Sequence, residues 1–319
     1  MDHSPASPNL DLAALKPRDA WGWLYVLLAS GMTGGAILFS SRSELVAWIF
    51  GQMLLSLALL QWFALLHEAG HKTLFRTAAL NRFWGYVAGF WALIPFDCWK
   101  LIHARHHYWT GWQDLDATTA TLVPRRLHWF ERAIVIVCWW TWIPLFSTLY
   151  RLNNYWYLPR LFRYFPDSRQ RIRLTINILV YLAAYVGLAF GIGLQRSAEL
   201  FGLSLLLTLM MQDPLILSQH THIPMELSGG DEVKPFPPIE QEVYTRSLIF
   251  PNWFARWILV NLDAHELHHV HPSVPGYYLH RLQRSTLNGV PWWRWLLQAK
   301  RVRGDVLLFQ NRHETGYDL

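Results

Sequence analysis

Residues 45–66 read LVAWIFGQMLLSLALLQWFALL and contain no charged side chain, although Glu44 directly precedes them and His67 directly follows. A helix needs about 20 apolar residues to cross the hydrocarbon core of a bilayer. The run therefore predicts a transmembrane helix, and it favours a membrane protein over a soluble one.

Three similar runs occur elsewhere in the chain. Residues 20–41 and 174–195 are uncharged, and residues 200–219 form a fourth apolar run that Asp213 interrupts. We expect four transmembrane helices, near 20–41, 45–66, 174–195 and 199–218. The expected fold is an all-α integral membrane protein with a cytoplasmic helical cap.

The composition excludes several other classes of protein. Hydrophobic residues make up 52% of the chain and charged residues only 16%, against about 25% charged in a typical soluble domain. A disordered chain would need the opposite balance. Cys98 and Cys138 are the only cysteines, which excludes a disulfide scaffold and a cysteine-bound iron–sulfur cluster, since the latter needs about four thiolates.

The basic residues predict the orientation in the membrane. Of 28 Lys and Arg residues, only Arg42 and Arg196 lie in the short turns between paired spans. Positive charge marks the cytoplasmic side, so both termini and both large segments are expected there, in a bacterial inner membrane. The net charge of +6 suits anionic lipid headgroups. The chain shows no basic stripe that would suit nucleic acid.

The remaining apolar stretches and the chain ends complete the expected organisation. Residues 83–96 and 133–150 are rich in Trp, and we interpret them as interfacial or re-entrant elements, with both spanning as the alternative. No small-residue cleavage site follows the first span, so it is expected to be retained. Residues 1–319 are interpreted as one domain with a polar N-terminal tail (1–19) and a C-terminal tail (286–319).

Most of the 15 histidines fall in four clusters. The clusters are HEAGH at 67–71, HARHH at 103–107, HTH at 220–222 and HELHHVH at 265–271. Spacings of three and four residues place side chains on one face of a helix, so each such cluster can direct several imidazoles to one point. The isolated residues His3, His128, His280 and His313 are expected to be ordinary surface or interfacial residues.

The number of histidines indicates which metal they bind. Imidazole binds iron, zinc, copper and nickel. HEAGH matches the H-E-x-x-H zinc protease pattern, in which Glu68 would be the general base. A catalytic zinc takes only three protein ligands, whereas eight or nine histidines converge here. This surplus favours a dinuclear iron site, and an intramembrane zinc protease is the alternative.

The order HxxxH, HxxHH, HxxHH on a four-helix membrane chain resembles the membrane fatty acid desaturase family over roughly residues 20–285. The QHTH segment at 219–222 and the run from His271-Pro272 to Val274-Pro275 are also similar to that family. The resemblance implies that two irons are held by histidines of these boxes, namely His67, His71, His103, His106, His107, His265, His268 and His269. The ninth ligand would be His220, with His222 as the alternate. Ile216 stands where some relatives carry an Asn.

The resemblance also implies the chemistry. Two non-haem irons and dioxygen would oxidise an unactivated fatty acyl chain, most simply to a C=C double bond. Hydroxylation, carotenoid ketolation and oxidative decarboxylation to a terminal alkene remain alternatives within the superfamily. A non-catalytic metal-storage or transport protein is a further class, disfavoured because the clusters lie at helix ends. Glu68, Asp114 and Asp116 are candidates to orient the ligands, with ordinary solvated charge as the alternative.

The proposed reaction also needs an electron donor and a binding tunnel for the acyl chain. The chain lacks a His-Pro-Gly-Gly haem motif and a nucleotide-binding glycine fingerprint. The resemblance therefore implies a separate ferredoxin, rubredoxin or cytochrome b5-type donor with its reductase. A candidate docking region, or merely a membrane anchor, is the basic run Arg160, Arg163, Arg169, Arg171 and Arg173. An apolar tunnel is expected for the acyl chain, and Trp99, Trp109 and Trp112 are candidates to line it or to form an interfacial belt.

Overall fold

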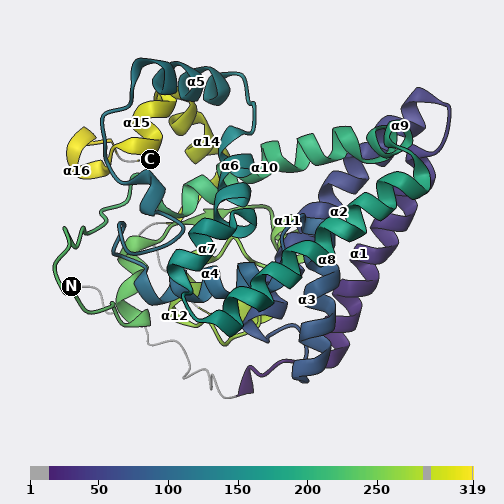
Figure 1. The fold of residues 1–319 in the computed structure, drawn as a ribbon, viewed down its shortest axis with the longest axis horizontal. Helices are drawn as coiled ribbons and strands as arrows, with labels where there is room; N and C mark the ends of the chain where they lie inside the picture. Colours follow the sequence, from purple (N-terminus) through teal and green to yellow (C-terminus); the bar gives the residue numbers. More distant parts are fainter. Residues whose placement is uncertain (1–13, 283–288, 318) are drawn as a thin grey trace.

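The computed structural model describes residues 14–282, 289–317 and 319. Four long apolar helical segments are long enough to cross a membrane. They are α1 (Asp19–Ser40), α2 (Leu45–His71), α8 (Ser168–Ile192) and a segment from Leu194 to His220. These match the four expected spans and confirm an all-α membrane protein. They lie together on the right of Figure 1.

The fourth candidate span runs from Leu194 to His220 and changes helix type along its length. It begins as α9 (Leu194–Ser197), passes through the π-helical turn η4 (Ala198–Gly202) and continues as α10 (Leu203–His220). Asp213 is the charged residue inside this apolar segment. Its carboxylate is tolerated there because it accepts hydrogen bonds from the Ser147 backbone N–H at 2.6 Å and from the Ser147 hydroxyl. A buried carboxylate needs such partners.

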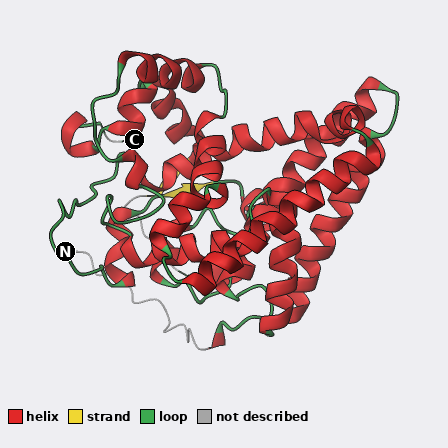
Figure 2. Ribbon diagram, viewed as in Figure 1, coloured by secondary structure: helices red, strands yellow, loops and turns green. Residues whose placement is uncertain are grey.

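Among the described residues, shorter helices, one pair of strands and the loops between them make up the remainder (Figure 2). The helices before α8 are α3 (Ala78–Ala92), α4 (Phe96–Trp109), η2 (Ala120–Leu122), α5 (Trp129–Trp140), α6 (Leu145–Arg151), η3 (Leu152–Trp156) and α7 (Leu158–Tyr164). After α10 come η5 (Pro238–Tyr244), β1 (Ser247–Ile249), α11 (Asn252–Trp257), α12 (His265–Val270), α13 (Gly276–Leu279), β2 (Gly289–Pro291), α14 (Trp292–Arg301), α15 (Gly304–Phe309) and α16 (Arg312–Thr315).

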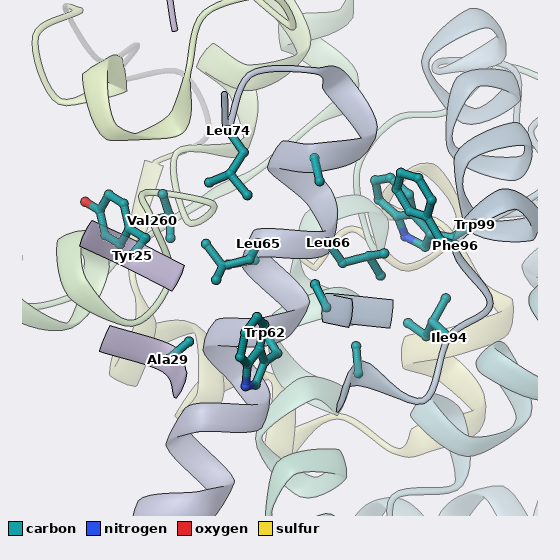
Figure 3. Close-up of a cluster of buried hydrophobic side chains, with 14 of the residues drawn as sticks. Tyr25, Ala29, Trp62, Leu65, Leu66, Leu74, Ile94, Phe96, Trp99 and Val260 are labelled. Carbon is teal, nitrogen blue, oxygen red and sulfur yellow. The ribbon is translucent and has the colours of Figure 1, made fainter. Parts of the chain in front are cut away.

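The principal core surrounds the second half of α2. In Figure 3 the side chains of α2 lie between those of α1 and α4; the cluster includes Tyr25, Ala29, Trp62, Leu65, Leu66, Phe96 and Trp99. The Trp62 indole donates to the Thr33 hydroxyl at 2.9 Å, so its one polar atom is satisfied inside the core. By contrast, Phe190 on α8 is 86% exposed. An outward face of this kind suits hydrocarbon rather than water.

The two Trp-rich stretches form short or bent elements. Residues 83–96 include most of α3, which packs along α2 and ends at Ala92, before Leu93 with φ 57°. Residues 133–150 belong to α5 and α6, and the helix pair 129–140 and 145–156 is bent by 115°. The bent pair fits either a broken span or a re-entrant loop, so the interfacial or re-entrant interpretation and its spanning alternative both stay predictions.

The C-terminal segment is folded where it is described. Strand β2 pairs in parallel with β1, joining Ser247 to Gly289, and α14 buries Trp295 completely. Lys300 donates to the Trp139 carbonyl of α5, and Gly304 packs against the same tryptophan. The described part of the expected C-terminal tail (286–319) thus forms three short helices, of which α14 and α15 pack against α5. His3 and most of the expected N-terminal tail lie outside the described residues.

Candidate metal centre

Four helices bring nine of the predicted histidines together. His67 and His71 lie one turn apart at the end of α2, and α4 contributes His103, His106 and His107. His220 is the last residue of α10, and the six-residue helix α12 carries His265, His268 and His269. The local spacing places each group on one helical face, and the packing of α2, α4, α10 and α12 directs the groups to a common region.

The first histidine set comprises His67, His71, His103, His107 and His268. The Nε2 atoms of His71 and His103 lie 2.7 Å apart, and His107 Nε2 lies 3.1 Å from that of His103 and 3.0 Å from that of His268. One nitrogen each of His67, His71, His103 and His268 falls within a group no wider than 4.8 Å. This set can hold one metal ion.

The second histidine set comprises His106, His220, His265 and His269. Its Nε2 atoms form a chain, with 3.2 Å from His106 to His269, 3.1 Å from His269 to His265 and 3.0 Å from His265 to His220. These nitrogens form a second group within 4.8 Å. The rings of His107 and His269 stack at 4.4 Å between centroids and so join the two sets.

The protonation chemistry of the rings suits metal binding. A neutral imidazole has one N–H donor and one acceptor, so several mutually close nitrogens cannot all be satisfied by one another. Both ring nitrogens of buried His67 lack a hydrogen-bond partner among the described residues. Burial, followed by repulsion from neighbouring imidazoles, holds the pKa of His103, His107, His265, His268 and His269 well below the usual value. Neutral imidazole is the form that ligates a metal.

The structure separates the two candidates for the ninth position. His220 faces the second set, and its Nδ1 lies 3.1 Å from the Tyr244 carbonyl oxygen. His222 has φ 52°, and its Nδ1 lies 3.2 Å from the Leu307 carbonyl oxygen of α15. His222 therefore lies against α15 and does not belong to either group of clustered histidines. The structure therefore brings His220, and not the alternate His222, to the other eight histidines.

One of the three candidate carboxylates contacts a clustered histidine through a hydrogen bond. Asp116 is fully buried, and its Oδ2 lies 2.7 Å from His106 Nδ1. Burial alone would raise the pKa of Asp116, but His106 and the Thr118 backbone N–H lower it overall. A carboxylate on Nδ1 fixes the tautomer that leaves Nε2 free as a ligand atom.

The other two carboxylates have structural partners. Glu68 Oε2 accepts from the Thr73 hydroxyl at 2.7 Å and from the Gly276 N–H at 2.8 Å, while Oε1 approaches His67 Nδ1 only to 3.5 Å. Asp114 accepts from the backbone N–H and hydroxyl of Ser228. Glu68 thus joins α2 to α13 rather than facing an open metal position, as the general base of a zinc protease would.

Gln241 is a site residue that the sequence analysis missed. It lies in η5 and is 2% exposed. Its Nε2 donates to the His107 carbonyl oxygen at 2.8 Å, and its Oε1 lies 3.0 Å from His269 Nδ1. One amide therefore positions rings of both histidine sets. No local pattern marks Gln241, because its partners lie far along the chain.

One cavity adjoins the histidines, and a second cavity lies next to it. The inner cavity, about 60 Å³, is lined by His67, His103, His106, His220 and His265 together with Trp99. The outer cavity, about 480 Å³, lies among α5, α6, α10 and α15 and is mainly apolar. The two cavities share Leu122, Phe146, Tyr150 and Leu217 as walls. Leu149 and Leu152 of the outer cavity are each 52% exposed, so this cavity reaches the apolar outer surface.

The expected tryptophan lining is present in part. Trp99 lies in the wall of the inner cavity and stacks on His103 with 4.3 Å between ring centroids. Trp112 instead stacks on Phe236 and donates to the Lys234 carbonyl oxygen, away from both cavities. Trp109 is absent from the described walls of both cavities.

Comparison with known proteins agrees with this arrangement. Residues 43–297 match the model of the fatty acid desaturase family. An sn-1 oleoyl-lipid 12-desaturase of Picosynechococcus is 21% identical over 90% of this chain and 81% of its own length. The enzyme of the same name from Synechocystis is 22% identical over 89% of this chain and 84% of its own length. A chloroplastic sn-2 acyl-lipid omega-3 desaturase (ferredoxin) of Helianthus annuus is 24% identical over 68% of this chain and 50% of its own length.

Proposed function

Because this chain belongs to the fatty acid desaturase family, whose members are oxidoreductases, we propose that it introduces a C=C double bond into an unactivated fatty acyl chain at a two-iron centre. The observation that carries the proposal is the meeting of two histidine sets, each gathered around one point, with an apolar cavity. Two non-haem irons would supply the oxidising power that dioxygen and two electrons generate there.

In this proposal the chain's own residues hold and orient the metal ligands. The first histidine set offers five imidazoles to one iron, and the second set offers four imidazoles to the other. Asp116 fixes the tautomer of His106, the Tyr244 carbonyl does the same for His220, and Gln241 orients His269. Such partners of the ligating rings determine metal affinity as well as geometry.

The substrate is proposed to be an acyl chain that enters from the membrane. The names of the cyanobacterial relatives describe oleoyl groups on lipids, and the outer cavity here offers apolar walls that reach the surface between α5, α6 and η3. An extended chain passing Leu122, Phe146, Tyr150 and Leu217 would reach the inner cavity beside His67 and His106. The same walls exclude water from the reacting carbon.

We place the histidine clusters and both termini on the cytoplasmic side, because the basic residues avoid the two short turns between spans. Electrons would come from a separate ferredoxin, rubredoxin or cytochrome b5-type protein with its reductase. His71, His103 and His107 of the first set are partly exposed, whereas His220 is the one partly exposed member of the second set. The first set is therefore proposed to receive the electrons.

Metal content and lipid products of the full-length protein test this function together. We expect two irons per chain and a new unsaturated acyl chain in cells that express the protein. His268→Ala removes one ligand of the first set and should abolish the product. Two irons with an alcohol, a ketone or a terminal alkene as product would support the two-iron centre but contradict double-bond formation. One zinc and unchanged lipids would contradict the two-iron centre itself.

A substitution in the shared cavity wall tests the substrate path. Leu122→Trp adds bulk where both cavities meet, so we expect at least a tenfold loss of product, or a shift toward shorter chains, with iron content unchanged. Product yield per bound iron is the measurement, and Leu122→Met, which nearly conserves volume, is the control. An unchanged product profile in Leu122→Trp would show that the acyl chain takes another route.

A further inference from the structure

A third cavity, of about 240 Å³, lies apart from the two acyl cavities. It lies where the end of α2 meets the first turns of α3, α4 and α8, and it opens to the surface beside the exposed residues Lys72, Arg82 and Arg173. A cavity needs only about 10–15 Å³ to hold one water. This cavity therefore has room for a small hydrated ion or headgroup.

Four cations line this third cavity, which we call the basic pocket: Lys72, Arg82, Lys100 and Arg173. The adjacent carboxylate is Asp97, which is buried and already accepts from Arg173 and from the Tyr86 hydroxyl. Arg82 lies over the Tyr86 ring at 5.9 Å. Among the residues that the structure describes, one carboxylate, that of Asp97, pairs with a member of this group of four cations.

The cations of the basic pocket repel one another. Burial, and then the charges of Lys72 and Arg173, lower the pKa of Lys100. Within the described part of the chain, neither Lys72 nor Lys100 has a hydrogen-bond acceptor or an ion-pair partner. Asn81 also lines the pocket, but its amide already donates to the carbonyl oxygens of Phe75 and Thr77. Any hydrogen bonds to a bound anion must therefore come from the four cations or the backbone. A cleft lined by charges of one sign raises the local concentration of counter-ions, which are anions here.

The backbone adds to this positive potential. Helix α3 has 15 residues and begins at Ala78, in the wall of the pocket. Thr77 precedes it without a side-chain cap for the first-turn N–H groups. Uncapped N–H groups at a helix start carry partial positive charge and favour anions. The pocket thus combines four side-chain cations with a helix start.

The position of the pocket indicates the source of the anion. Ala69 and Lys72 mark the end of the membrane-spanning helix α2, and Arg173 lies in the first turns of α8. Phosphate groups of lipids lie at the level where membrane spans end. Basic pockets between spans on the cytoplasmic side suit such headgroups, with Arg as a two-pronged donor and Lys as a point charge.

We propose that the basic pocket binds a phosphoryl group, supplied by the headgroup of an anionic phospholipid. Lys72 directly follows His71, and Lys100 lies one turn before His103. An occupied pocket would therefore join the ends of α2 and α4, the two helices that carry most of the first histidine set. The basic pocket is distinct from the inner and outer cavities. Phosphoryl binding there can be tested whether or not the proposed desaturation is correct.

Ligand-dependent thermal unfolding of the detergent-solubilised full chain tests the proposal. The probes are dioctanoyl phosphatidic acid, dioctanoyl phosphatidylcholine and inorganic phosphate, with ionic strength held constant by KCl. Phosphatidic acid should raise Tm in a saturable way, as for any ligand that binds only the folded state, and phosphatidylcholine should not. The variant Lys72→Gln/Lys100→Gln should raise the half-saturating concentration of phosphatidic acid about tenfold or more.

Matched variants distinguish specific binding of the phosphoryl group in the basic pocket from non-specific attraction to exposed cations. Arg169→Gln removes an exposed cation of α8 outside the pocket and should leave the response unchanged. Arg82→Gln serves as a second test if the double lysine variant does not fold. A response to phosphatidic acid alone, or to inorganic phosphate as well, supports the phosphoryl site and identifies its source. No saturable response, or an equal loss in Arg169→Gln, would overturn the proposal.

Discussion

Gly70→Ala is expected to reduce activity by about a hundredfold and to lower iron content, although alanine is the best helix former. Gly70 lies in α2 between His67 and His71, and a Cβ atom there would come within 2.1 Å of Cζ3 of Trp99. The Trp99 indole stacks on His103 and meets the His67 ring edge-on at 5.6 Å. The added methyl would therefore displace the ring that positions two ligands, and a misplacement of about 1 Å can cost a hundredfold in rate.

Activity, iron content and thermal stability of Gly70→Ala check this expectation. The overpacked core should also lose about 1–3 kcal/mol of unfolding free energy. Gly187→Ala in α8 is the matched control, because no atom lies within 4 Å of a Cβ there. That variant should equal the parent or gain up to about 1 kcal/mol. If the two alanine variants behave alike, Trp99 does not support the site in the manner described.

Asp116→Asn is expected to weaken iron binding by about 10–100-fold. The asparagine keeps the size of the side chain but removes its charge. Its amide can also present an N–H to His106 Nδ1, which would move the ring proton to Nε2, the ligand atom. Because Asp116 is fully buried and bonded to Thr118, no solvent replaces the lost contact.

Iron retained during a chelator challenge measures the effect of Asp116→Asn. Asp114→Asn is the control, since this carboxylate lies two residues away but bonds Ser228 instead of a histidine. We expect the Asp114 variant to retain iron as the parent does. Equal retention in all three proteins would show that the carboxylate on His106 contributes nothing to the metal centre.

The membrane spans were predictable because the cost of burying charge in lipid leaves a local mark on the sequence. Their ends were less so. Helix α8 begins at Ser168, where Asp167 caps it by accepting from the Gln170 N–H at 2.9 Å, and it then runs through three arginines before the apolar stretch. Hydropathy detects the part within the membrane, whereas capping determines where the helix starts.

The histidine clusters were predictable for a similar reason, since spacings of three and four place ligands on one face. Their supporting residues were not. Asp114 and Asp116 are equivalent in the sequence, and only the fold determines that one meets His106 and the other Ser228. Gln241 is separated from His107 by more than a hundred residues. Contacts of this kind depend on packing rather than on any local pattern.

The C-terminal helices escaped prediction because they are short and amphipathic. Helix α14 mixes Trp295, which is fully buried, with Arg294, Lys300 and Arg301. A prediction of helices from long uncharged runs does not detect such a segment. Its packing on α5 also places Leu308 and Phe309 of α15 in the wall of the outer cavity.

The metal ligands and much of the outer cavity wall come from different helices, which has an evolutionary consequence. The nine histidines come from α2, α4, α10 and α12, whereas much of the outer cavity wall comes from α5, α6 and α15. Mutations that reshape the wall leave the ligand helices untouched. Descendants of one ancestor can therefore diversify in the length and shape of the molecules they accept while inheriting the same reactive core.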